Sequence, residues 1–232
     1  MDLIWQGLLK SIQLLLKGDP EVLEVTLLTL RVSCTATLLS LIIGVPLGTL
    51  LALKKFPGRR FLFSIVNTGM GIPPVVVGLW VSIFLWRAGP LGKLNIMYTP
   101  EAIILAQTVI AMPLIVGLTG AALQQTDPKL RLLIRALGTT KLQYLWILLK
   151  EVRFAILAAV IAGFGAVVSE VGASMMVGGN IKGQTRVLTT ATVLEVSKGN
   201  FDVAIALSII LSLLAYFVTL WLTLLQQKSQ GG

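Results

Sequence analysis

The sequence has no histidine, a single cysteine and little charge of either sign. Only 12% of its 232 residues are charged, against roughly 25% in an ordinary soluble domain, and 56% are hydrophobic. Without histidine, and with Cys34 alone in an apolar run, the chain lacks the ligands for a zinc site and a partner for an intrachain disulfide. With so few polar residues, we expect the lipid bilayer to be the protein's main solvent.

Acidic residues are scarcer than basic ones, with 10 Asp and Glu against 19 Lys and Arg, which gives a net charge of +9. A nucleic-acid-binding protein would gather its basic residues on one solvated face, whereas here they lie between apolar runs. We therefore expect no nucleic-acid partner and interpret the basic residues as topology signals.

Five apolar runs are each long enough to cross a bilayer core, which takes about 20 helical residues. They cover residues 25–53, 61–86, 102–123, 154–177 and 203–225. The predicted fold class is therefore all-α, a polytopic membrane protein with five transmembrane helices in one domain over residues 21–232. In residues 1–20 apolar side chains recur at helical spacing up to Gly18-Asp19-Pro20, which predicts an amphipathic helix in the membrane interface.

Orientation follows from the positive-inside rule, which counts basic residues near the ends of the spans. The connection at residues 54–60 is very short and carries four basic residues and no acidic one. Counting all connections, eleven of the 19 basic residues fall on the side of this loop. We therefore predict a multi-pass protein of the cell membrane whose N-terminus is outside and whose C-terminus is cytoplasmic.

Glycine and proline interrupt the first two runs. The residues concerned are Gly44, Pro46 and Gly48, and then Gly69, Gly71, Pro73 and Pro74. Such residues bend or unwind a helix, and broken helices often line transport pathways. They are also simply commoner in membrane helices than in soluble ones, so the sequence leaves both interpretations open.

Two charged residues lie inside the predicted spans, where each must face protein or water. Glu170 sits in the fourth run among small residues, which predicts a buried structural partner or a gate. Arg31 sits about two turns into the first run, where it either extends its charged end outward or pairs with a carboxylate such as that of Glu170.

A long polar segment, residues 124–151, separates the third and fourth runs on the predicted inner side. Asp127 followed by Pro128 is a helix-start pattern, because the carboxylate caps the helix and proline suits its first position. Gly138 is typical of a residue that ends a helix with a positive φ angle, and Thr139 and Thr140 are suited to cap a second one. The pattern predicts two short helices joined at a glycine, a protruding elbow.

This elbow resembles the cytoplasmic coupling loop of inner-membrane permeases of binding-protein-dependent ABC importers. Their motif reads Glu-Ala-Ala, three residues, Gly, nine residues and then Ile-x-Leu-Pro. Gly138 stands at the motif glycine and Leu148 at the apolar position ten residues on, while residues 132–134 and 150–151 depart from the pattern. The resemblance implies that an ATPase contacts this loop through residues Arg131, Arg135, Ala136, Leu137, Gly138, Thr139 and Lys141.

A second resemblance lies in residues 169–190, where Ser169-Glu170-Val171-Gly172-Ala173 leads into a polar stretch that begins at Gly178. This segment is similar to the oxyanion branch of these permeases, above all to tungstate-type ones. The implied function is ATP-driven import of an oxyanion, most closely tungstate, with molybdate or sulfate as alternatives.

The resemblance also implies partners, because a permease of this type hydrolyses no ATP itself. ATP and Mg²⁺ would bind to separate cytoplasmic ATPase subunits. The permease would form a homodimer, and an extracellular or periplasmic binding protein would deliver the anion to loops that include Lys93 and residues 182–186. The chain itself offers no phosphate-binding loop, since Gln184 occupies the position at which such a loop needs lysine.

Candidate pathway or gate residues are prolines at the second interruption and side chains that donate or accept hydrogen bonds within the spans. They are Asn67, Thr68, Pro73, Pro74, Ser169, Glu170, Ser174, Thr189 and Thr192. Two other classes remain open at this stage. The first is a secondary transporter without an ATPase, which an inverted repeat or titratable residues in several spans would favour. The second is a membrane scaffold that transports nothing, which would need neither broken spans nor a basic elbow.

Overall fold

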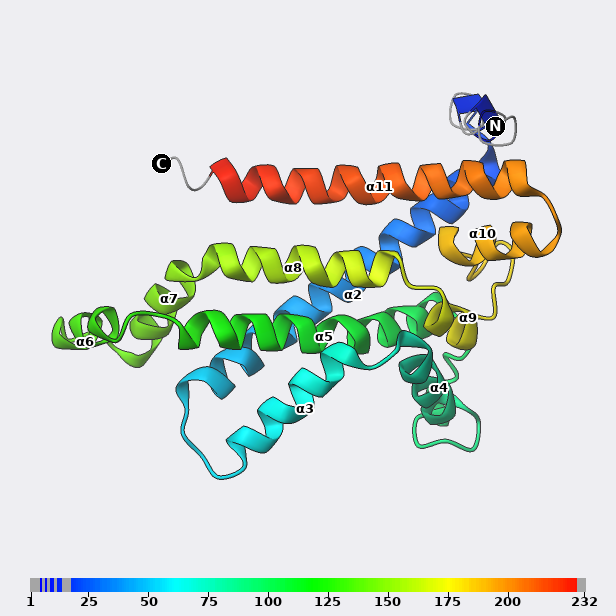
Figure 1. Ribbon diagram of the computed structural model, residues 1–232. Helices are drawn as coiled ribbons and strands as arrows, with labels where there is room; N and C mark the ends of the chain where they lie inside the picture. The colour runs from blue at the N-terminus through cyan, green and yellow to red at the C-terminus, as the bar shows by residue number, and fades with distance from the viewer. Residues whose placement is uncertain (1–4, 6, 8, 11, 14–17, 229–232) are drawn as a thin grey trace.

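The computed structural model describes residues 5, 7, 9–10, 12–13 and 18–228, and the predicted interfacial helix at residues 1–20 falls largely outside them. Between residues 18 and 228 the chain forms helices and turns and no strand (Figure 1). In chain order the elements are α2 (Pro20–Leu53), α3 (Arg59–Gly71), α4 (Pro74–Leu85), the 3₁₀ helix η1 (Gly92–Leu94), α5 (Pro100–Gln124), α6 (Pro128–Ala136), α7 (Lys141–Glu151), α8 (Arg153–Val168), α9 (Gly172–Gly178), α10 (Leu188–Ser197) and α11 (Phe201–Lys228). The all-α prediction is confirmed.

Three helices in the described part of the chain, α2, α5 and α11, are each long and apolar enough to cross a membrane. Two further spans are bent pairs, α3 with α4 at 108° and α7 with α8 at 65°, so the number of candidate spans reaches the predicted five. The predicted interruption of the second run is confirmed. Pro73 and Pro74 lie at the start of α4, where proline replaces amide groups that a helix end leaves unpaired.

The fourth span differs from its prediction as a single helix over residues 154–177. Helix α8 ends at Val168, a short break follows, and α9 starts at Gly172 as a separate seven-residue helix. Apolar content marked the whole run as membrane material, but it carries no information about a change of helix direction. The residue that accounts for the break is Glu170, because its side chain binds the backbone of the new helix.

Helix α2 is continuous through Pro46, so the glycines around this residue do not break the span. They instead allow close packing against α5. A Cβ atom on Gly48 would lie 2.5 Å from the carbonyl oxygen of Val116, and one on Gly44 would lie 2.9 Å from a side-chain carbon of Ile115. The first interruption therefore serves helix contact rather than a bend.

Gly48→Ala is expected to lower the apparent midpoint of thermal unfolding in detergent, because the new methyl group meets backbone that cannot rotate away. Overpacking of this kind costs roughly 1–3 kcal/mol. Gly165→Ala in α8 is the matched control, since a Cβ atom there meets nothing within 4 Å. Equal shifts in the two variants would contradict the close-packing assignment.

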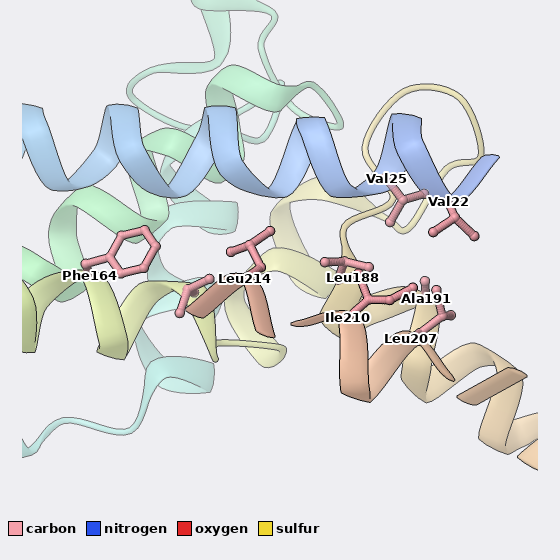
Figure 2. Packing of buried hydrophobic residues seen from close by; sticks show 9 residues of the cluster. Val22, Val25, Phe164, Leu188, Ala191, Leu207, Ile210 and Leu214 are labelled. Atoms are coloured by element: carbon pink, nitrogen blue, oxygen red, sulfur yellow. The ribbon is translucent and has the colours of Figure 1, made fainter. Parts of the chain in front are cut away.

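The bundle has two ends (Figure 1). The elbow end holds the loop at residues 54–58, helices α6 and α7, and the C-terminal end of α11, while the opposite end holds the start of α2, η1, α9 and α10. Toward the opposite end, apolar side chains of α2, α8, α10 and α11 form one cluster (Figure 2). Its buried members are Val22, Val25, Phe164, Val168, Leu188, Ala191, Leu207, Ile210 and Leu214.

Candidate functional site

The elbow between α6 and α7 is built by local capping, as its sequence predicts. The Asp127 carboxylate accepts a hydrogen bond from the backbone amide of Lys129 at 2.8 Å, with Pro128 in the first helical position. Gly138 has a φ of +70°, a conformation that costs glycine little and other residues more. Thr140 and Gln143 then form a reciprocal capping box at the start of α7. The two helices and their junction are confirmed.

The elbow is attached to the bundle by its buried side chains. Ile134 of α6 and Leu148 of α7 pack with Ala52 of α2 and Leu123 of α5 in one apolar cluster. Arg131 adds a polar connection, because its guanidinium donates to the carbonyl oxygen of Leu123 in the last turn of α5. These contacts connect the elbow to the ends of α2 and α5.

The outer surface of the elbow is apolar and uncovered. Its exposed residues are Leu132, Leu133, Leu137, Leu142 and Trp146, each exposed by more than half. Basic side chains flank them, and the Arg135 guanidinium lies over the Tyr144 ring at 5.1 Å, which ties α6 to α7. The apolar residues of this segment thus divide, with Ile134 buried and Leu133 and Leu137 facing outward. An apolar surface with a polar rim is typical of a protein-docking site.

Glu170 forms a second polar centre, at the break between α8 and α9. It is only 4% exposed, and its carboxylate accepts hydrogen bonds from the amides of Ala173 and Ser174 and from the Ser174 hydroxyl. The Thr189 hydroxyl donates to the Glu170 backbone carbonyl at 2.9 Å. Three donors satisfy the buried carboxyl group, so this residue holds α9 in place, and the Thr189 bond joins α10 to it.

The polar stretch after α9 is joined to the start of α2. Glu21 receives Lys182 at 2.6 Å and Arg186 at 3.2 Å, so these two basic residues are already paired with a carboxylate. Further along, the Leu188 amide donates to the Thr29 hydroxyl at 2.9 Å. Residues 182–188 therefore form a clamp at the opposite end of the bundle, more than 150 positions from their partners in sequence.

A neighbouring polar cluster closes the turn between α10 and α11. Glu195 accepts hydrogen bonds from Lys198 at 2.7 Å and from Asn200 at 2.8 Å. These hydrogen bonds hold the pKa of the Glu195 carboxyl below its ordinary value. The turn is therefore supported by a carboxylate that stays ionised at neutral pH.

A family model matches residues 44–230 of the chain, and its description is "binding-protein-dependent transport system inner membrane component". The chain belongs to this family. The match includes the elbow, the Glu170 centre and the last span, so the permease is a multi-pass membrane protein.

Relatives and solved structures agree with this assignment. The permease is 35% identical to the tungstate uptake system permease protein TupB of Peptoclostridium acidaminophilum, over 98% of this chain and 100% of that protein. It is 37% identical to TupB of Campylobacter jejuni, over 93% of this chain and 90% of that protein. Its fold resembles a chain of the inward-facing MetNI methionine ABC transporter, with a TM-score of 0.71, 21% identity and coverage of 90% and 98%.

The structure brings some of the permease's predicted pathway residues together and separates others. Glu170, Ser174 and Thr189 meet in one buried cluster. Ser169 and Thr192 do not join it, because each hydroxyl donates to the carbonyl four residues earlier in its own helix, at 2.8 Å. This is the usual arrangement of a hydroxyl in a membrane helix.

Asn67 and Thr68 lie apart from this cluster, on the exposed surface of α3, and Pro73 and Pro74 mark the sharp turn after that helix. Arg31 forms no ion pair with Glu170 in the described part of the permease. Arg31 is exposed on α2, and its Coulombic interaction is with Glu101 in the first turn of α5. Of the two options for Arg31, the structure therefore agrees with an outward side chain and not with a pair with Glu170.

Several connecting residues escape sequence reasoning altogether. Glu21 is an ordinary acidic residue of a helix's first turn by pattern, yet it holds the clamp. Gln107 is 2% exposed in α5 and donates to the Val167 carbonyl at 3.1 Å, beside the break after α8. For Gln107, the available signal in the sequence was an amide side chain in the middle of an apolar run. Such a side chain is expected to find a hydrogen-bonding partner in another helix, because a buried polar group needs one.

Proposed function

We propose that this chain is the permease subunit of an ABC importer that carries tungstate across the cytoplasmic membrane by ATP-driven alternating access. The observation that carries the proposal is identity of 35% and 37% to two tungstate uptake permeases, each over nearly the whole chain. Molybdate and sulfate are the alternative substrates, because all three are tetrahedral dianions that need only donors and positive potential.

The elbow supports the proposed ATPase partner. Its outer surface exposes Leu137, Leu142 and Trp146, while Ile134 and Leu148 hold it to the bundle. In the proposed mechanism, a cytoplasmic ATPase dimer binds ATP and Mg²⁺, closes, and moves the elbow together with α2 and α5. In this proposal two copies of the permease enclose the pathway between them.

The arrangement of the connections supports the proposed direction, with the N-terminus outside and the C-terminus cytoplasmic. The basic loop at residues 54–58, the elbow and the C-terminal end of α11 share one end of the bundle (Figure 1). The positive-inside rule assigns this end to the cytoplasm. An external binding protein would then dock at the opposite end, near Lys93 and the clamp formed by residues 182–188.

The test is ATPase activity of the reconstituted transporter with its binding protein, titrated with tungstate, molybdate and sulfate. We expect tungstate to stimulate hydrolysis at a concentration at least about tenfold below that of the other anions, a factor that corresponds to roughly 1.4 kcal/mol. Equal responses to the three anions would overturn the tungstate assignment. Uptake that proceeds without the ATPase would instead favour a secondary transporter.

A further inference from the structure

A groove at the elbow end of the bundle contains two of the predicted pathway residues, Asn67 and Thr68. It lies between α3 and the end of α5, with a volume of about 620 Å³. We call it the α3–α5 groove. Its lining residues are Arg59, Arg60, Phe63, Ser64, Asn67, Thr68 and Gln124. A space of this size is typical of small-ligand sites.

One side of the groove is a polar stripe along α3. Arg60, Ser64, Asn67 and Thr68 follow one another at helical spacing and share a face. None of these side chains has a hydrogen-bonding partner within the described part of the chain. The stripe therefore has unused donors in a helix that borders a membrane, where unused polar groups are costly.

Several hydroxyls elsewhere in the membrane helices are satisfied within their own helix, although those of Ser33 and Thr119 are not. Thr26, Thr37 and Thr223, for example, each donate to the carbonyl four residues earlier at 2.6–2.8 Å. Ser64 and Thr68 lie in a regular helix with the same option and do not take it. Their hydroxyls remain available to a ligand in the groove.

The charge of the groove suits an anion. Its lining includes two arginines and no carboxylate. Arg59 is already engaged, because its guanidinium donates to the carbonyls of Leu51 and Ala52 at the end of α2, which leaves Arg60 as the free charge. A second pocket, at the opposite end of the bundle, has the opposite charge balance. Its lining has two basic residues and three acidic ones, Asp19, Glu21 and Glu195.

We propose that the α3–α5 groove is a binding site for a tetrahedral oxyanion, the last site that the anion contacts before release into the cytoplasm. Arg60 pairs with its charge, while Ser64, Asn67, Thr68 and Gln124 donate hydrogen bonds. The direction of release rests on the proposed function, whereas the binding site itself rests on the groove alone.

A lipid phosphate shares this chemistry but fits the stripe less well. From Arg60 to Thr68 the polar residues extend along the helix for about 12 Å, at 1.5 Å per residue. A lipid held at Arg60 would lay its acyl chain along hydroxyl and amide groups, whereas a hydrated anion hydrogen-bonds to them throughout. The stripe therefore favours a free oxyanion.

Protection of an introduced thiol tests the site in the complete transporter in nanodiscs, where both faces are accessible. Cys34 is first replaced by alanine, because it is exposed. Ser64→Cys then places a thiol in the groove, with Thr68→Cys as the second variant should the first not fold. Lys55→Cys is the control, since Lys55 is exposed in the adjacent loop and does not line the groove.

We expect tungstate to slow modification of the Ser64→Cys thiol by a cationic methanethiosulfonate reagent several-fold, and to leave the Lys55→Cys thiol unaffected. Adding Arg60→Gln should raise the half-protecting tungstate concentration roughly tenfold, because a charge-assisted hydrogen bond is lost. Lys54→Gln removes one charge from the preceding loop, outside the groove lining, and should leave that concentration unchanged.

Two results would overturn the site: no protection by tungstate, or equal effects of Arg60→Gln and Lys54→Gln. The lipid alternative is separated by nanodiscs of phosphatidylcholine with and without phosphatidylglycerol, since protection by the anionic lipid in the absence of tungstate would assign the groove to lipid. Protection without anion-stimulated ATP hydrolysis would leave the site standing and remove the proposed function.

Discussion

Gly138→Val is expected to release the ATPase from the purified transporter. Gly138 has a φ of +70°, and its position has open space around it, so the effect comes from the backbone and not from a clash. Valine resists this conformation by roughly 1–2 kcal/mol or more, which reorients α7 relative to α6. The outward leucines would then no longer form one surface. Co-purified ATPase should fall by about tenfold or more, measured per permease by quantitative gel analysis.

Gly138→Asn is the matched control, because asparagine tolerates the left-handed region better than other non-glycine residues. It should keep most of the ATPase bound and most of the anion-stimulated hydrolysis. If the valine and asparagine variants retain the ATPase equally, the elbow is not the docking site. If both lose it equally, the glycine acts through its lack of a side chain and not through its conformation.

Glu170→Ala is expected to destabilise the permease more than any other change considered. The variant leaves the amides of Ala173 and Ser174 without an acceptor in a buried site, and each unsatisfied donor costs roughly 1–3 kcal/mol. The apparent thermal midpoint in detergent should fall clearly. ATP-driven uptake should be lost as α9 detaches from α4, against which it packs closely at Gly78.

Two neighbouring variants separate this role from a role of the charge in transport. Glu170→Gln keeps one acceptor oxygen and should lie between the wild type and the alanine variant in stability. Ser169→Ala removes an exposed hydroxyl that bonds within its own helix, so we expect little change in either measurement. A stable Glu170→Ala variant without uptake would show that the carboxylate acts as a gate and not as a helix cap.

Local patterns were sufficient to predict the elbow. Asp127, Pro128, Gly138 and Thr140 act on backbone groups within a few residues of themselves, so their meaning does not depend on the rest of the fold. The turn at Pro73 and Pro74 was predictable for the same reason. Apolar runs likewise predicted the all-α membrane fold, since the requirement to satisfy backbone groups in lipid leaves helices as the form for such runs.

Pattern was insufficient wherever a side chain finds its partner in another element. Sequence spacing marked Gly44 and Gly48 as possible break points, yet contact with α5 makes them packing sites. Leu133 and Ile134 are adjacent apolar residues of α6, yet the bundle leaves the first exposed and buries the second. The sequence left two options for Arg31, and only the fold decides between them, because it leaves this side chain exposed and within Coulombic range of Glu101 at the start of α5.

The sequence by itself determined that this chain is a membrane protein of several helices, with a basic elbow at one end. Hydrophobicity and helix capping depend on short segments of sequence, so they can be predicted without knowing which helices pack together. The tertiary structure alone decided that Glu170 caps α9, that Arg131 ties the elbow to α5 and that Glu21 holds the clamp. Such contacts depend on how the helices pack, because packing brings together residues that the chain keeps apart.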